Sequence, residues 1–243
     1  MRPRQVGRKS YDNAVIKNGR PQGCRVRGDT GTVAAKKRVG RPSEQDALRR
    51  SLLEATQARI GREGLSGISA RALAGDVSCS VAGIYRIFGD LDALILEANL
   101  NTLILFDGYI ARTRAEGFAR HPAGAQDFLV RLALAYLDFA LDHTNRWRAL
   151  FEFRWSGKDK PLPDWYALEQ VRLFSYIETP LRLLCPDLDE AGSRTLARSL
   201  FSVTHGLVSL GLDQRLMAFS ADVLRDQVRT VVAATARGLA RAD

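Results

Sequence analysis

Histidine and cysteine side chains do much of the acid–base, nucleophilic and metal chemistry of proteins, and in this sequence they lie far apart. The three of each type are His121, His143, His205, Cys24, Cys79 and Cys185. None has a partner at metal-ligand spacing, and no nucleophile-elbow, zinc-protease, phosphate-loop or dinucleotide-binding motif occurs. The sequence therefore predicts no enzyme, no metal site and no cofactor. Isolated cysteines also suit a reducing cytoplasm, where we expect the protein to act.

Basic side chains, in contrast, are concentrated at the start of the sequence. Residues 1–42 hold twelve Lys or Arg and two Asp, whereas the other 201 residues carry 24 basic and 25 acidic side chains. We therefore expect residues 1–42 to form a basic, disordered arm that binds a polyanion. Arg38 and the Gly-Arg-Pro sequence around Arg41 resemble hooks that enter the minor groove of DNA. The alternative is a solvated linker whose cations act only as diffuse counterions.

Two patterns argue against a membrane partner. The longest stretch without a charged residue, 199–212, has fourteen residues, which is fewer than a helix needs to span a bilayer. Residues 1–42 hold no apolar segment of the kind that secretory signals contain. We therefore expect no membrane partner, and the alternative is a basic arm that binds an acidic membrane surface.

The segment Ile68–Phe88 reads ISARALAGDVSCSVAGIYRIF and predicts two short helices joined by a tight turn. Ser69 and Ser80 are typical first residues of the two helices, over about 69–77 and 80–88. This arrangement is a helix-turn-helix, in which the second helix enters the major groove. The N-termini of these two helices would then lie close to phosphate groups of the DNA. The candidate phosphate contacts are Ser69, Ser80, Tyr85 and Arg86, and the small residues expected near base edges are Val81, Ala82 and Gly83.

The stretch LLEATQARIGREGLSGISARALAGDVSCSVAGIYRIFGDLDAL resembles the DNA-binding module of the tetracycline-repressor (TetR) family. A glycine ends its first helix at Gly64, and Tyr85 and Phe88 form the Tyr-x-x-Phe ending of its third. The resemblance implies a homodimer that binds a palindromic operator in double-stranded DNA, and a small-molecule effector. His205-Gly206 is also similar to a C-terminal motif of one TetR subgroup.

Three residues depart from the pattern of that family. Ser78 stands where a glycine is usual in the turn, which costs about 1–2 kcal/mol if the backbone there is left-handed. Leu91 replaces a lysine that commonly contacts a phosphate, and Arg59 replaces an apolar residue of the first helix. The missing lysine removes one expected contact to the DNA backbone.

Aromatic residues gather in the middle of the chain, where fourteen of the nineteen lie between Phe106 and Tyr176. They form either an aromatic core or a mainly apolar pocket between helices. The resemblance favours the pocket without identifying its ligand. The candidate ligand-binding residues are Phe106, Tyr109, Tyr136, Phe139, Trp147, Phe151, Trp155, Trp165 and Phe174.

Two apolar stripes end the chain, on predicted helices at about 189–213 and 220–240. They suit a four-helix interface between two subunits, and burial within one subunit is the alternative. The candidate interface residues are Leu200, Val203, His205, Gly206, Leu207, Leu210, Val228, Val231 and Val232.

Helical periodicity dominates from Ser43 onward and no window alternates like a strand, so the predicted fold class is all-α. We expect a basic arm over 1–42, a three-helix DNA-binding domain over 43–92, and a helical effector-binding and dimerisation domain over 93–243. The predicted function is a ligand-responsive transcriptional repressor. The alternative is an architectural or non-specific DNA-binding protein that uses mainly its basic arm.

Overall fold

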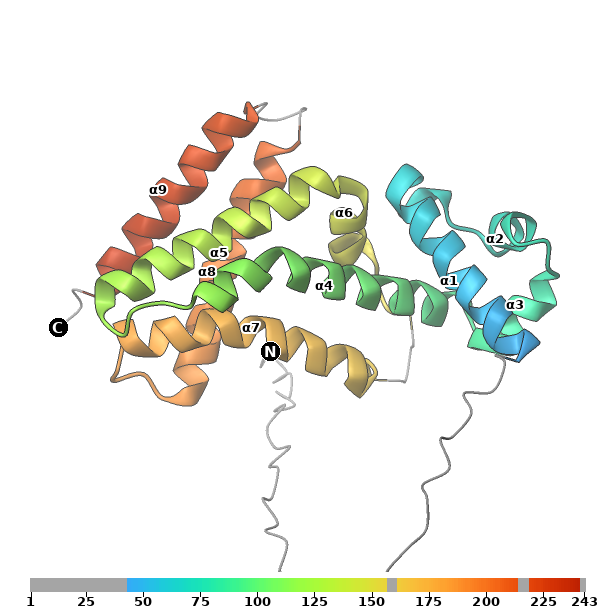
Figure 1. Cartoon of the computed structure of the whole chain (residues 1–243), viewed down its shortest axis with the longest axis horizontal. Helices are drawn as coiled ribbons and strands as arrows, with labels where there is room; N and C mark the ends of the chain where they lie inside the picture. The colour runs from blue at the N-terminus through green and yellow to red at the C-terminus, as the bar shows by residue number, and fades with distance from the viewer. Residues whose placement is uncertain (1–42, 157–160, 214–218, 241–243) are drawn as a thin grey trace, which may run out of the picture. The chain divides into compact units, whose positions relative to one another are not determined.

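The computed structural model describes residues 43–156, 161–213 and 219–240, and these contain helices and no strand (Figure 1). The all-α prediction is therefore confirmed. The arm over 1–42, with Arg38 and Arg41, lies outside the described residues. The elements in chain order are α1 (Glu44–Glu63), a 3-10 turn (Leu65–Gly67), α2 (Ala70–Asp76), α3 (Val81–Phe88), α4 (Leu91–Glu116), α5 (Pro122–Asp142), α6 (Thr144–Glu152), α7 (Asp164–Leu184), α8 (Glu190–Gly211) and α9 (Ala221–Leu239).

Most helices begin at a side chain that accepts a hydrogen bond from a backbone amide of the first turn. Ser43 and Asp46 form a reciprocal capping box at the start of α1. Asp90 begins α4 in the same manner, with its Oδ1 accepting from the amide of Ala93. Gly64 and Gly117 follow α1 and α4 at positive φ, where glycine is not strained. These local signals explain why the helix ranges were predictable.

Two sets of helices have separate cores. Leu52, Leu73, Ile84 and Phe88 pack together with Leu94 among α1 to α4. A larger core joins α5 to α9, with Phe139, Leu181 and Val228 among its buried members. The boundary expected between residues 92 and 93 falls inside α4, which is continuous through it and contributes to both cores.

Helix α4 is the one described element long and apolar enough to cross a membrane by length and composition. However, 44% of its most apolar window is buried in the protein. It packs against α1, α5, α6 and α7, and Figure 1 shows it running beside α5 and α7. Its apolar side chains are therefore used in packing between helices.

Candidate nucleic-acid interface and ligand cavity

Helices α2 and α3 form the helix-turn-helix expected from the sequence. Ser69 Oγ accepts from the amide of Ala72 at 3.2 Å, and Ser80 Oγ accepts from the amide of Gly83 at 3.1 Å. Ser78 in the turn has φ of 53°, so this non-glycine residue does adopt the left-handed conformation. The turn keeps its geometry despite the substitution of the usual glycine.

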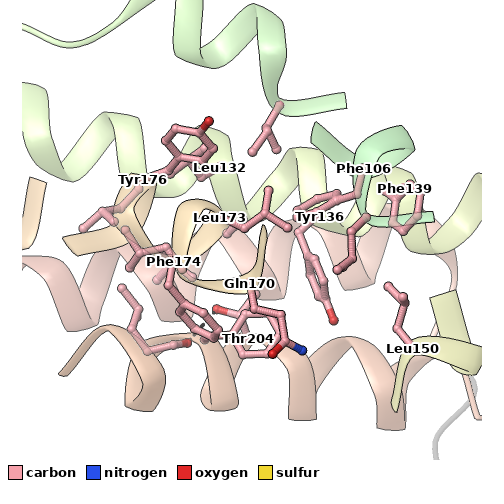
Figure 2. A pocket seen from close by; sticks show the side chains of 18 of the residues that line it. Phe106, Leu132, Tyr136, Phe139, Leu150, Gln170, Leu173, Phe174, Tyr176 and Thr204 are labelled. Atoms are coloured by element: carbon pink, nitrogen blue, oxygen red, sulfur yellow. Dashed lines mark hydrogen bonds between the residues drawn. The ribbon is translucent and has the colours of Figure 1, made fainter. Parts of the chain in front are cut away.

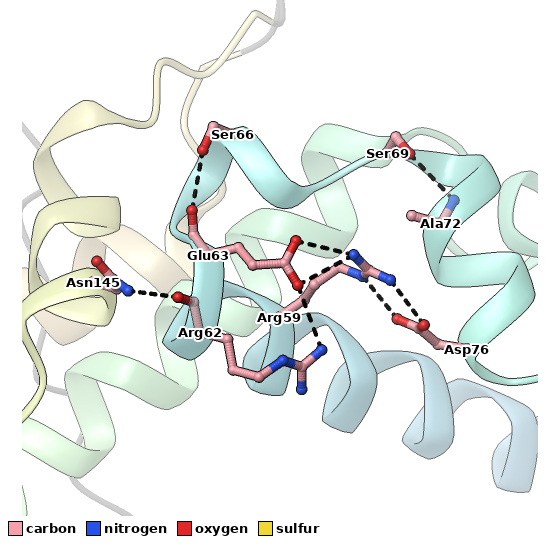
Figure 3. A network of polar contacts seen from close by, with 8 residues as sticks. All are labelled: Arg59, Arg62, Glu63, Ser66, Ser69, Ala72, Asp76 and Asn145. Atoms are coloured by element: carbon pink, nitrogen blue, oxygen red, sulfur yellow. Dashed lines mark hydrogen bonds and ion pairs between the residues drawn. The ribbon is translucent and has the colours of Figure 1, made fainter.

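Arg59 ties the helix-turn-helix to α1. Its Nε and Nη2 donate to the two carboxylate oxygens of Asp76 at 2.8 and 2.9 Å, and its Nη1 lies 3.1 Å from Glu63 (Figure 3). The guanidinium of Arg59 lowers the pKa of Asp76 below its ordinary value through these hydrogen bonds. The unusual arginine of α1 therefore holds the end of α2, which explains how a polar residue replaces an apolar one there.

The exposed side of α3 carries most of the residues expected to touch DNA. Val81, Ala82, Tyr85 and Arg86 are exposed, and the Tyr85 side chain keeps 46% of its accessible surface. Gly83 is instead buried, with its amide bonded to Ser80 Oγ, so its exposure does not support the expected place near base edges.

One basic residue of this surface was missed by sequence reasoning. Arg71, in the first turn of α2, is exposed, and neither it nor Arg86 forms an ion pair with any described residue. Arg71 could have been predicted from the sequence, because it lies two residues after Ser69 in the first turn of the same helix. Two uncompensated guanidinium groups therefore lie on the helices of the helix-turn-helix.

A cavity of about 190 Å³ lies among α4 to α9 (Figure 2). Five of the predicted ligand-binding residues line it: Phe106, Tyr136, Phe139, Phe151 and Phe174. Its other walls are mainly aliphatic, and no charged side chain of the described residues lines it. The cavity is therefore suited to an apolar molecule.

The other four predicted ligand residues do not line the cavity. Trp147 is buried behind the wall, and its Nε1 donates to the Tyr136 hydroxyl at 2.8 Å. Tyr109 donates instead to Asp142 at 2.9 Å. Trp155 packs with the cluster around Leu96, and Trp165 is 42% exposed on α7. Aromatic composition located the region of the cavity but not which ring faces inward.

Helix α7 supplies the polar lining that sequence reasoning missed. Tyr166, Gln170 and Tyr176 all line the cavity from this helix, as does Phe174. The spacing of Tyr166, Gln170, Phe174 and Ile177 places them on one helical face, and this spacing was the available signal. Burial raises the pKa of Tyr166 to about 12.

His205 completes a polar chain behind the cavity wall. The hydroxyl of Tyr136 shares a hydrogen bond of 2.7 Å with Nδ1 of His205, and the imidazole packs on Phe151 with ring centroids 4.1 Å apart. Burial lowers the pKa of His205, which favours the neutral ring. We assign the shared proton to the Tyr136 hydroxyl, so Nδ1 accepts. His205 therefore faces the inside of the subunit.

The predicted interface residues on α8 and α9 separate into two groups. Leu200, Val228 and Val232 have at most 5% of their surface exposed, because they pack in the large core, and they are corrected to core residues. Leu207 and Val231 are half-buried. Val203 and Leu210 are exposed at 47% and 46%. A Cβ added at Gly206 would meet no atom within 4 Å.

The described residues contain no group of three or more His, Cys, Asp or Glu side chains able to hold a metal ion.

The fold and the two sites together define a helix-turn-helix protein whose larger set of helices encloses a cavity. Residues 129–235 match the family described as "Tetracyclin repressor-like, C-terminal domain". No curated protein sequence matches the chain.

Solved structures share the fold. A protein of unknown function from Rhodococcus sp. RHA1 is 21% identical with a TM-score of 0.60, over 85% of this chain and 100% of that one. A putative TetR-family transcriptional regulator from Rhodococcus sp. is 18% identical with a TM-score of 0.56, over 78% and 99%. The multidrug binding protein EbrR, solved with imidazole, is 18% identical with a TM-score of 0.51, over 76% and 93%. The family match thus covers residues 129–235, and the likeness to these solved structures shows a shared fold.

Proposed function

We propose that this chain is a cytoplasmic, homodimeric repressor that binds a palindromic operator in double-stranded DNA and releases it when a small molecule occupies the cavity. The observation that carries the proposal is the exposed side of α3 together with Arg71 and Arg86, which form no ion pair with any described residue. Val81 and Ala82 at the start of α3 are small enough for close approach to base edges. Arg71, Arg86 and Tyr85 are the proposed phosphate contacts, together with the helix starts at Ser69 and Ser80.

The proposed dimer uses the outward face of α8 and α9. On α8 this face consists of Ser199, Ser202, Val203, Gly206 and Leu210, and on α9 of Val223, Gln227, Thr230, Ala234 and Gly238. It carries no charged residue, and α8 and α9 are in contact with each other. Gly206 and Gly238 have open space above them, which permits the close approach of helices from a second copy. Two copies would present two α3 helices, which explains the expected palindrome.

Helix α6 offers a physical connection between the cavity and the helix-turn-helix. Leu150 and Phe151 line the cavity, while Asn145 at the other end of α6 donates to the carbonyls of Gly61 and Arg62 at 3.0 and 3.1 Å. A ligand that displaces α6 therefore acts on the end of α1. Regulation requires that the ligand bind the DNA-incompetent state more tightly, because equal affinity for both states shifts nothing.

Selection of sites from random duplex DNA tests the proposal. The full chain should enrich a pseudo-palindromic motif with two half-sites. Arg86→Ala should lower affinity for it and reduce the magnitude of the salt slope by about 1.8, because the dimer loses two phosphate contacts of about 0.9 each. Arg112→Ala is the matched control, because Arg112 is an exposed arginine of α4 that pairs with Glu116. Enrichment of no motif would contradict the proposal.

Removing residues 1–37 separates operator recognition from non-specific binding through the basic arm. The shortened chain should keep the selected motif and lose part of the salt dependence, since each neutralised phosphate contributes about −0.9 to the slope. A protein that binds DNA mainly through its arm would instead lose binding altogether. That result would favour the architectural alternative.

A further inference from the structure

The polar groups that line the cavity differ in whether they already have partners. The hydroxyl of Tyr136 is bonded to Trp147 and His205, as described above. The hydroxyl of Tyr176 accepts from Arg114 and Arg172, each at 2.7 Å. Thr204 Oγ1 donates to the carbonyl of Leu200 at 3.0 Å. These three side chains are therefore held by groups of the protein itself.

Tyr166 and Gln170 are different. Neither makes a hydrogen bond with any described residue, although Tyr166 is only 4% exposed. Among the described residues, Asn99 and Ser193 hold the fully buried side-chain polar atoms that lack a partner, so the Tyr166 hydroxyl keeps some accessible surface and is available to a ligand in the cavity. The two residues stand one turn apart on α7, and both line the cavity. Gln170 is also exposed, which places it where the cavity meets solvent.

Charge is the second distinguishing property of this cavity. Within the part of the chain that the structure describes, no charged side chain lines the cavity. The charged cluster next to Tyr176 is internally balanced: Arg114 and Arg172 both lie within 3.1 Å of Asp107, and Arg172 also pairs with Glu169. A charged ligand would lose its hydration without gaining a counterion. Neither acids nor organic cations are therefore matched by this site.

We propose that the cavity selects an uncharged, compact, mainly apolar ligand with one hydrogen-bonding end, which is held by the Tyr166 hydroxyl and the Gln170 amide. An apolar cavity of about 150 Å³ accommodates benzene. The cavity here, with its opening at Gln170, has room for a molecule of one or two aromatic rings. Phe106, Phe139 and Phe174 contact the rings, and an alcohol, phenol, ketone or amide group meets α7.

This inference deepens the proposed function, because it names the class of effector for the same cavity. A matched probe series tests it by calorimetry on the full chain: 2-methylnaphthalene, 2-naphthalenemethanol, 2-naphthoate and 2-naphthylmethylammonium. The alcohol should bind about fivefold more tightly than the hydrocarbon, as one net hydrogen bond predicts. The two ions should bind at least roughly 100-fold more weakly than the alcohol.

Variants of α7 test whether Tyr166 and Gln170 bind the hydrogen-bonding group of the ligand. Tyr166→Phe and Gln170→Leu should each reduce the preference for the alcohol over the hydrocarbon while leaving hydrocarbon affinity within about twofold. Tyr176→Phe is the matched control, because this cavity tyrosine already accepts two hydrogen bonds. An equal loss for both probes, a loss only in Tyr176→Phe, tighter binding of an ion, or no binding of any probe would each overturn the inference.

The same probes added to the protein–operator complex distinguish this inference from the proposed function. Binding with the expected selectivity but no release of DNA would contradict ligand-responsive regulation and leave the chemistry of the cavity standing. Release of DNA by a charged member of the series instead would support regulation and overturn the uncharged ligand.

Discussion

Ser78 holds a backbone conformation that serine rarely adopts. Its φ of 53° lies in the left-handed region, and the turn between α2 and α3 requires it because the amide of Cys79 reaches back to the carbonyl of Ala74 at 2.9 Å. Serine at this position costs about 1 kcal/mol relative to glycine. The sequence already indicated this residue as the place where the turn departs from the TetR-like pattern.

Ser78→Gly should therefore raise the free energy of unfolding by about 0.5–1 kcal/mol, measured by urea denaturation followed by circular dichroism. The same change at Ser51, an exposed residue in the middle of α1, is the matched control and should lower stability, since glycine disfavours a helix interior. Equal effects at the two positions would contradict backbone strain at Ser78.

The lowered pKa of His205 predicts that the stability of the folded chain depends on pH. Burial lowers its pKa in the folded chain below the ordinary value of 6.5, so the unfolded chain binds a proton first as the pH falls. The stabilising contribution is fully present above about pH 6.5 and decreases below it. Protonation also removes the acceptor that Nδ1 offers to Tyr136.

The free energy of unfolding should consequently decrease more between pH 7.5 and pH 5.5 in the native chain than in His205→Gln, whose neutral amide does not titrate. Denaturation series at several pH values measure the difference. Parallel curves for the two proteins would show that His205 contributes nothing to the pH dependence.

At the scale of the elements, local chemistry made the helices predictable. Ser69, Ser80 and Asp90 each satisfy an amide within three residues, and Gly64 ends α1 at positive φ, so these boundaries depend on short-range interactions. The structure places the helices expected at about 69–77, 80–88, 189–213 and 220–240 within two residues of these ranges. Local signals of this kind are present in a single sequence.

Which face of a helix is buried depends on the rest of the fold. Both sides of α8 carry apolar residues, so periodicity alone could not place Leu200 in the core and Val203 on the surface. The same limit applied to the aromatic residues, where Trp147 faces away from the cavity and Tyr166 faces it. Partners far apart in the sequence decide these orientations, and a single helical pattern does not contain them.

The contact that Asn145 makes between α6 and α1 leads to a testable prediction. Its amide joins the start of α6 to the last carbonyls of α1, so Asn145→Ala removes a connection between the cavity helices and the DNA-binding helices (Figure 3). We expect unchanged affinity for 2-naphthalenemethanol, but a several-fold smaller effect of that ligand on operator affinity. Fluorescence anisotropy with labelled operator, with and without ligand, measures this coupling.

Asn101→Ala is the control for this experiment, because Asn101 is an exposed asparagine of α4 without a hydrogen bond to the described residues. It should leave both the ligand affinity and the ligand effect unchanged. If Asn145→Ala retains the full ligand effect, then coupling does not pass through this contact.

At the scale of the whole molecule, the proposed function depends on two copies of the chain acting together. Val203, Leu210 and Val223 leave between 44% and 47% of their surface exposed on adjacent helices. Exposed apolar residues that form a continuous uncharged face mark an interaction surface, whereas scattered ones do not. A second copy that presents the same face satisfies the symmetry of an isologous dimer.

Val203→Asp should therefore convert the protein to a monomer at micromolar concentration in sedimentation velocity, because it places two carboxylates at the centre of the proposed interface. Operator affinity should fall at least roughly 100-fold, since each monomer holds only one half-site. Leu168→Asp is the matched control, as Leu168 is 64% exposed on α7, a helix that contributes no residue to the proposed interface. It should remain dimeric and bind DNA. Circular dichroism confirms that both variants keep their helices, and a dimer that survives Val203→Asp would show that this face is not the interface.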